Sequence, residues 1–196
     1  IEGRASVHIS EPAYCKRFCG RVLEHVKIGR SPEWIEDRLR SNGIRTSNNV
    51  VAAANYVMLE FGQPLHTNDY DKVAGHSLTC RHAHEGEKFF SLFGQERQLK
   101  PSDLVIADGD DKAACVAGVM GGFDSEVTAE TKNVLLESAV FDSASIRRTS
   151  RRLGLRSEAS GRYEKGINPA RSEMAINRIC QLLEEQGAAT TAKGML

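Results

Sequence analysis

The clearest pattern of apolar and polar positions lies within residues 47–69, where it follows the spacing of a helix. One of the two asparagines at 48 and 49 can cap this helix, because an asparagine oxygen accepts a backbone N–H left free at a helix start. Gly62 ends the pattern, and a turn stiffened by Pro64 then presents His66. We therefore expect a rigid helix that delivers His66 to a functional site. The apolar face consists of Val50, Val51, Ala54, Val57, Met58 and Phe61.

Three further segments show helical spacing between a capping residue and a glycine. Serine, aspartate and asparagine favour helix starts because their oxygens accept free backbone N–H groups, and glycine favours helix ends because it adopts the left-handed conformation. The chain therefore contains about four predicted helices. The three segments are Ser31-Pro32 to Gly43, Asp142 to Gly154, and Asn168-Pro169 to Gly187.

Between residues 76 and 141 the apolar period shortens towards two, which is typical of strands. Turn signals at 93–95 and 108–111 separate neighbouring strands as they do in hairpins, so the pairing should be mostly antiparallel. The sequence thus predicts an α+β fold with largely antiparallel mixed sheets, sandwich-like, flanked by about four helices. The candidate strands are His76–Ala83, Lys88–Leu92, Leu104–Ala107, Ala114–Val119 and Val134–Ser138.

Length and composition predict one composite domain over residues 7–187, with a linker at 1–6 and a frayed tail at 188–196. Ile1-Glu2-Gly3-Arg4 reads as a processing-protease site in a chain without a starting methionine, which indicates a piece of a longer protein. No apolar run approaches a membrane span, and the five cysteines include no C-x-x-C pair. We expect reduced thiols, no membrane contact and a cytoplasmic location.

The formal net charge of zero hides a segregation of charge along the chain. Residues 145–171 hold eight basic and two acidic side chains, a composition that suits contact with a polyanion. Residues 103–142 hold nine acidic and two basic side chains, so internal ion pairing is an equally good interpretation of the arginines. The arginines of this basic segment that we consider for binding are Arg147, Arg148, Arg151, Arg152 and Arg156.

Two features between the strands and the basic segment carry candidate chemistry. The glycine turn, residues 118–122, follows a predicted strand and allows a ligand to approach bare backbone amides, although the sequence favours a bulged turn that needs glycine dihedral angles. Glu137 ends the apolar run 134–136, where a carboxylate needs a partner, such as a nearby arginine, or a function. Cys80, His82 and His84 alternate along one strand but lack a fourth ligand, so no metal site is predicted.

Seven strings, in order along the chain, resemble the central region of the bacterial phenylalanyl-tRNA synthetase β subunit, the module that edits mischarged tRNA. The resemblance covers nearly the whole chain. It implies an aminoacyl-ester hydrolase that removes tyrosine from tRNA(Phe), because a hydrophobic synthetic pocket rejects an added hydroxyl only weakly. The strings are SPEWIEDRLRSNGIR, NYVMLEFGQPLH, DLVIAD, AGVMGG, NVLLESAVF, RRTSRRLGLRSEAS and RYEKGINP.

The resemblance also implies roles for individual residues. Glu137 matches the family position that recognises the tyrosine hydroxyl, and Gly118 matches the backbone position beside it. His66 matches the histidine near the ester and the terminal ribose, where it orients the adenosine or the attacking water. Asn55, Ser157 and Ala159 match the remaining pocket positions: Asn55 and Ser157 are expected near the reaction, and Ala159 near the bound amino acid in a loop. The arginines of the basic segment would meet the phosphates of the tRNA acceptor end.

For the whole synthetase the resemblance implies a heterotetramer with an α subunit, which uses ATP and Mg²⁺, whereas this module needs no cofactor. The sequence departs from the family pattern at Ala52, Ala54, Asn68, Phe93 and, mildly, at Ser157, which keeps the hydroxyl of the usual threonine. We expect the two alanines and Asn68 to flank the pocket. They leave open an alternative, a non-catalytic module that contacts tRNA or supports the subunit with a degenerate pocket.

Overall fold

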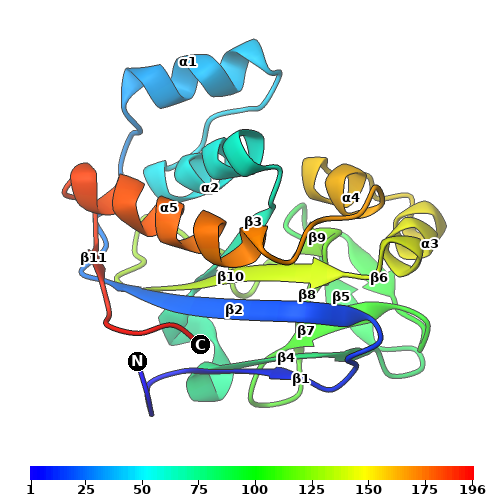
Figure 1. The fold of residues 1–196 in the computed structure, drawn as a ribbon. Helices are drawn as coiled ribbons and strands as arrows, with labels where there is room; N and C mark the ends of the chain where they lie inside the picture. The colour runs from blue at the N-terminus through cyan, green and yellow to red at the C-terminus, as the bar shows by residue number, and fades with distance from the viewer.

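The computed structural model describes residues 1–196 as three layers, with helices above a four-stranded sheet and a five-stranded sheet below it (Figure 1). The four-stranded sheet has the order β11-β2-β10-β3 and is antiparallel throughout. Its strands are β2 (Cys15–Glu24), β3 (Leu65–Asp69), β10 (Val134–Phe141) and β11 (Thr190–Thr191).

The lower sheet has the order β1-β4-β7-β8-β9, with one parallel pair, β1 and β4, and antiparallel pairs elsewhere. A separate hairpin of two short strands, β5 and β6, turns at 93–95 as expected, and the β7–β8 turn at 108–111 also agrees with the sequence. The strands are β1 (Ser6–Ile9), β4 (Ser77–His82), β5 (Lys88–Phe90), β6 (Glu96–Gln98), β7 (Leu104–Ala107), β8 (Ala113–Val116) and β9 (Met120–Gly121).

Five α-helices, one more than expected, complete the α+β fold. The short helix α4 was missed because its six residues are too few to show a period. The helices are α1 (Glu33–Ser41), α2 (Asn49–Phe61), α3 (Ser143–Leu153), α4 (Glu158–Tyr163) and α5 (Arg171–Glu185), and two short 3₁₀ turns cover Tyr70–Lys72 and Ala74–His76. None of the helices is both long and apolar enough to span a membrane.

Two hydrophobic cores separate the three layers. Strand β10 is buried along its whole length because alternate side chains enter different cores: Leu135 packs between the sheets, and Leu136 packs towards α2 and α5. This burial on both faces explains why the strand reads as a continuous apolar run. It also means that Glu137, which shares a face with Leu135, points towards the region between the sheets.

The capping residues at two helices behave as the sequence predicts. Asn48 accepts a hydrogen bond from the Val51 amide, and Asp142 accepts one from the Ser145 amide. The prediction that Ser31 caps α1 is wrong, because its buried hydroxyl has no hydrogen-bond partner and the helix begins after Pro32. The last helix begins three residues later than Asn168, whose side chain instead accepts from the Ala170 amide.

The C-terminal residues are ordered in the sheet, contrary to the expected frayed tail. Thr190 and Thr191 pair with β2, and the backbones of Leu196 and Gly20 exchange hydrogen bonds at 2.9 and 3.2 Å. The first residues also join the fold, because the Ile1 ammonium donates to the Lys193 carbonyl at 2.8 Å and β1 begins at Ser6. Backbone pairing, which a weak apolar pattern does not reveal, holds both ends.

Candidate functional site

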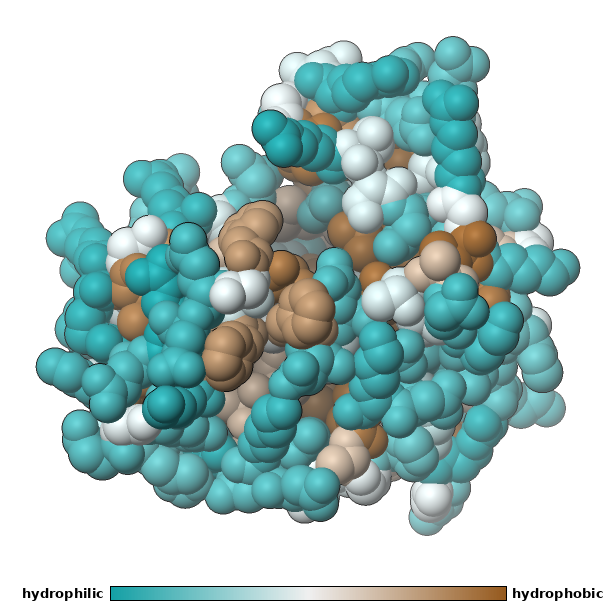
Figure 2. Space-filling model, turned by 180° about the vertical axis from the view of Figure 1, so that it is seen from behind, coloured by the Kyte–Doolittle hydropathy of each residue, from teal (hydrophilic) through white to brown (hydrophobic).

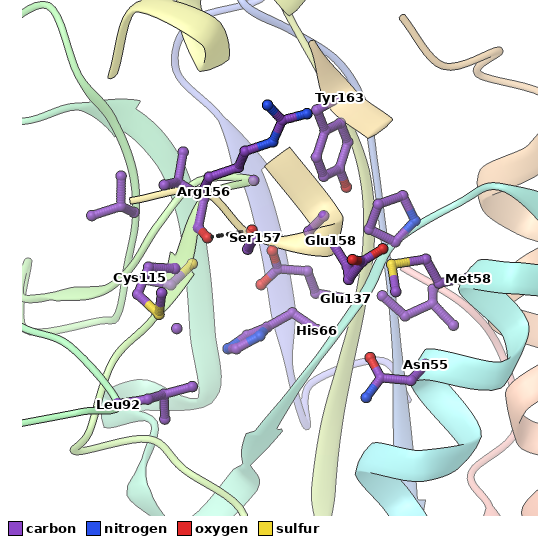
Figure 3. A pocket seen from close by; sticks show the side chains of 18 of the residues that line it. Asn55, Met58, His66, Leu92, Cys115, Glu137, Arg156, Ser157, Glu158 and Tyr163 are labelled. Atoms are coloured by element: carbon purple, nitrogen blue, oxygen red, sulfur yellow. Dashed lines mark hydrogen bonds between the residues drawn. The ribbon is translucent and has the colours of Figure 1, made fainter. Parts of the chain in front are cut away.

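A pocket of about 390 Å³ lies where the edges of the two sheets meet α2 and α4 (Figure 3). Its size is in the range of small-molecule sites, and 12 of its 21 lining residues are hydrophobic. Residues that the sequence singled out at distant positions converge here. They are Asn55, His66, Gly118, Glu137, Arg156, Ser157 and Ala159.

Strands β3 and β10 place His66 directly opposite Glu137 in the antiparallel register. Residues opposite each other in such a pair project from the same face of the sheet, so both side chains enter the pocket (Figure 3). His66 was expected in a turn after Pro64, and the structure places it in the strand instead. Pairing with β10 decides this, because the polar sequence of β3, LHTND, lacks an alternating apolar pattern.

Glu137 is 4% exposed, and burial raises its pKa to about 7. No arginine pairs with it, so the ion-pair interpretation is wrong, and its Oε2 atom has no hydrogen-bond partner. Burial acts in the opposite direction on His66 and lowers its pKa to about 4, since it disfavours the charged imidazolium. Around neutral pH the pocket therefore holds a neutral imidazole beside a carboxyl group that is close to its titration point.

Asn68 lies two residues beyond His66 on the same strand and therefore faces the same side of the sheet. It is 1% exposed, and neither its Oδ1 nor its Nδ2 atom has a hydrogen-bond partner. Although it forms no hydrogen bond of normal geometry, the nearby Asn68 amide opposes both pKa shifts, lowering the pKa of Glu137 and raising that of His66. Asn68 is thus a buried polar side chain beside His66 and Glu137 that does not itself line the pocket.

The glycine turn fits the interpretation in which the backbone itself requires glycine. Gly118 has φ of 68°, which only glycine adopts readily, and a Cβ atom there would lie 2.9 Å from Tyr163 and 3.0 Å from Phe141. A Cβ atom on Gly121 would lie 2.8 Å from Cε1 of His66. The backbone conformation and the close approach of pocket residues both require glycine here.

Ser157 caps α4, so Ala159 lies in a helix rather than in the expected loop. The Ser157 Oγ accepts from the Ser160 amide at 3.1 Å and donates to the Val119 carbonyl at 2.8 Å, and the Ser160 Oγ in turn accepts from the Ser157 amide at 2.9 Å. This capping box joins α4 to the glycine turn, so the single Ser157 proton is already in use. Ala159 lines the pocket from the first turn of α4. Asn55 of α2 points into the pocket (Figure 3), and its amide makes no hydrogen bond within the protein.

Some arginines of the basic segment form internal ion pairs, and others remain free to contact a polyanion. Arg152 forms an ion pair with Asp103, which is 1% exposed, as internal pairing predicts. Arg147, Arg148 and Arg151 are exposed on α3 without a carboxylate within 4.0 Å. Arg156 lines the pocket with a side chain 77% exposed and a single acidic neighbour, Glu164, at 3.8 Å.

Sequence reasoning missed Tyr163, which forms one wall of the pocket. Its ring packs beside Gly118 and Phe141, and its hydroxyl donates to the Ala139 carbonyl at 2.9 Å. Gln63 donates to the same carbonyl at 2.9 Å, so the start of β3 and the end of α4 are fixed on β10. A tyrosine inside an unrecognised short helix gives no sequence signal for this role.

The two alanines that depart from the family pattern do not flank the pocket. Ala52 and Ala54 are 0% and 5% exposed and pack in the core that separates the helices from the four-stranded sheet. They therefore give no indication of a degenerate pocket.

No group of three or more His, Cys, Asp or Glu side chains is arranged to hold a metal ion. Cys80 is a core residue, and His84 bonds to Asp111 at 2.8 Å.

Comparisons with known proteins agree with the resemblance found in the sequence. A family model described as the B3/4 domain matches residues 14–188. The phenylalanine-tRNA ligase beta subunit of Moorella thermoacetica is 50% identical over 196 residues, and that of Anaeromyxobacter dehalogenans is 49% identical over 190 residues. These alignments cover 100% and 97% of this chain, and the chain spans 24% of each relative's length.

Among solved structures, an N-terminal fragment of the phenylalanyl-tRNA synthetase beta subunit from Pyrococcus horikoshii has a TM-score of 0.63 to this chain. The match covers 95% of this chain and 50% of the other, at 14% sequence identity. At that identity the likeness concerns the fold alone.

Proposed function

The chain belongs to the B3/4 domain family, and from this premise we propose that its pocket hydrolyses the ester of tyrosine mistakenly attached to tRNA(Phe). The observation that carries the proposal is the buried, unpaired carboxyl of Glu137 opposite His66 in one pocket. The similarity to phenylalanine-tRNA ligase beta subunits supports the choice of substrate.

Glu137 provides the means to distinguish tyrosine from phenylalanine. A tyrosine hydroxyl would donate to the Glu137 carboxyl group at the pocket, whereas a phenylalanine ring would leave that buried group unpaired. Sites that hydrogen-bond a substrate hydroxyl reject the analogue without it by large factors, which purely apolar pockets do not achieve. The apolar wall around Gly118 and Tyr163 would hold the ring itself.

Hydrolysis would proceed by attack of a water oxygen on the ester carbonyl carbon. The bond to the ribose oxygen then breaks, and that oxygen takes a proton, which releases tyrosine and intact tRNA. The neutral His66 imidazole would position the water or the ribose hydroxyl, and the free amide of Asn55 would donate to the developing oxyanion. Ser157 would hold α4 and the glycine turn in place around them, because its hydroxyl bridges the two.

Within a complete ligase we expect this domain to act with the rest of the β subunit and with an α subunit, in the cytoplasm. ATP and Mg²⁺ would serve ligation on the α subunit. The editing step itself would need only water, because it breaks an ester that has already been made. Arg156 at the pocket would meet the phosphates of the acceptor end.

The test is release of tyrosine from Tyr-tRNA(Phe), compared with release of phenylalanine from Phe-tRNA(Phe), by this chain and by the whole enzyme that contains it. We expect faster release of tyrosine, and Glu137→Ala should bring the two rates together. Glu33→Ala, which removes an exposed carboxylate of α1 that has no ion pair and does not line the pocket, is the control. A whole enzyme that releases no tyrosine would refute the editing function.

A second function, tRNA contact without catalysis, is favoured by the three exposed and unpaired arginines of α3. It predicts binding that weakens with salt and persists when no ester is cleaved. The assay described above distinguishes the two functions, because only ester hydrolysis produces free tyrosine.

A further inference from the structure

Three phenylalanines are exposed near one another: Phe93 lines the pocket, and Phe90 and Phe123 line a second, smaller one. Phe90, Phe93 and Phe123 are 49%, 77% and 57% exposed and make up half of the six exposed large hydrophobic side chains of the molecule. Figure 2 shows hydrophobic side chains gathered beside a hollow in a largely hydrophilic face. Exposed apolar side chains that gather in one place mark an interaction site.

Backbone pairing fixes the three side chains relative to the pocket. Ser91 and Gly122 form an antiparallel bridge, and the Phe123 amide donates to the Phe90 carbonyl at 3.1 Å. Phe90 and Phe123 are therefore cross-strand neighbours on one face. On the other side of this bridge the Leu92 amide donates to the Gly121 carbonyl at 3.1 Å, and Phe93 lines the pocket. The backbone thus leads from the Phe90 and Phe123 pair to Phe93 at the pocket that holds His66 and Glu137, and we call these three phenylalanines the aromatic track.

Cations flank this aromatic track. Arg156 lines the same pocket as Phe93, and Arg97 of β6 has no carboxylate within 4.0 Å. Helix α3 touches the end of β6, because Arg152 donates to the Gln98 carbonyl at 3.5 Å, and it carries the unpaired Arg147, Arg148 and Arg151. Exposed aromatic rings beside positive charge are the combination that binds single-stranded nucleic acid, in which each ring stacks on a base.

We propose that Phe93, Phe90 and Phe123 form a stacking platform for the single-stranded 3′ end of an RNA. Phe93 takes the terminal base at the pocket, and the Phe90 and Phe123 pair takes the base before it. This inference rests on the proposed function, because it supplies the site that would carry the esterified ribose into the pocket. It adds to that function a binding site for the nucleotides, separate from the contacts made by the amino acid.

The test uses uncharged tRNA(Phe) with 2-aminopurine as the terminal base, or with pyrrolocytosine as the base before it, since both fluorophores dim when stacked. Binding to the wild-type chain should quench both. Phe93→Ala should abolish quenching of the first probe, and the double variant Phe90→Ala/Phe123→Ala that of the second, each with about tenfold weaker binding. Phe93→Tyr should retain quenching, and Phe93→Leu should not. Met174→Ala on α5, 55% exposed, is the control.

Unchanged quenching and affinity in the alanine variants would overturn the platform, as would a leucine variant that behaves like the wild type. A wild-type dimer that the alanine variants abolish in sedimentation would also overturn it, because the track would then be a contact between copies. Quenching that depends on the phenylalanines in a chain that cleaves no ester would support the platform and contradict only the editing function. If the chain cleaves the ester but quenching does not depend on the phenylalanines, the editing function would be supported and the platform contradicted.

Discussion

Glu137 of β10 and His66 of β3 are cross-strand partners whose side chains share one pocket. Burial moves both groups towards their neutral forms, raising the pKa of Glu137 to about 7 and lowering that of His66 to about 4. The pair therefore offers polar atoms to a ligand at little cost in buried charge. The same shifts tie the stability of the fold to pH.

Glu137→Gln should stabilise the protein increasingly as pH rises. The pKa of Glu137 is raised from 4.5 to about 7 on folding, so the unfolded chain ionises first and wild-type stability falls as pH increases across that window. Glutamine does not ionise, and the variant should gain roughly 3 kcal/mol over the wild type between pH 4.5 and pH 8. Urea unfolding of both proteins at several pH values measures this, and the contribution of His66 cancels in the difference. A difference that does not change with pH would contradict the buried, neutral carboxyl.

His66→Ala should lower kcat/KM for ester hydrolysis by about 100-fold, with little loss of stability. Because the pKa of His66 is lowered to about 4, the wild-type pH–rate profile should show no change from imidazole titration between pH 5 and pH 8. Deacylation rates across this range provide the measurement. A change in the deacylation rate near pH 6.5 that disappears in His66→Ala would contradict the lowered pKa of His66.

Gly118→Ala should destabilise the fold more than Gly154→Ala does. The two glycines have similar φ angles, 68° and 64°, so an alanine at either suffers the cost of the left-handed conformation, about 1–2 kcal/mol. Only at position 118 would the new Cβ atom meet Tyr163 and Phe141, because nothing lies within 4 Å at position 154. Thermal unfolding of both variants isolates the cost of this contact. Equal losses of stability in the two variants would mean that Tyr163 and Phe141 move aside without measurable cost.

Gly121→Ala should reduce hydrolysis by displacing the His66 ring, which would lie 2.8 Å from the new methyl group. Its φ angle is not in the left-handed region, so the backbone tolerates alanine and the effect should fall mainly on kcat. Gly29→Ala, where nothing lies within 4 Å, is the matched control. Kinetics of both variants with Tyr-tRNA(Phe) test the contact, and wild-type rates in Gly121→Ala would exclude it.

Two neighbouring arginines of α3 should respond differently to substitution. Arg152→Ala leaves the buried Asp103 without its cation and should cost about 2 kcal/mol of stability. Arg151→Glu, at an exposed position without an ion pair, should leave stability unchanged and weaken tRNA binding while reducing its salt dependence. Urea unfolding and filter binding at two salt concentrations measure the two effects. Stability losses of equal size would contradict the division of the arginines.

The sequence alone determined the features that depend on short-range chemistry. The caps at Asn48 and Asp142 were predicted because each acts on backbone amides within three residues. The strand at 104–107 and the start of β10 were predicted from their apolar runs. The resemblance assigned residues to one pocket, and the comparisons agree on the family.

The tertiary structure alone decided how distant segments meet. His66 lies in a strand because β10 supplies its hydrogen-bond partners, and the opposition of His66 to Glu137 depends on register, which no local pattern encodes. The tail at 190–191 is ordered by pairing with β2, and α4 is held by the bond from Ser157 to Val119. The pKa shifts of His66 and Glu137 follow from burial, which exists only once the sheets and helices have packed together.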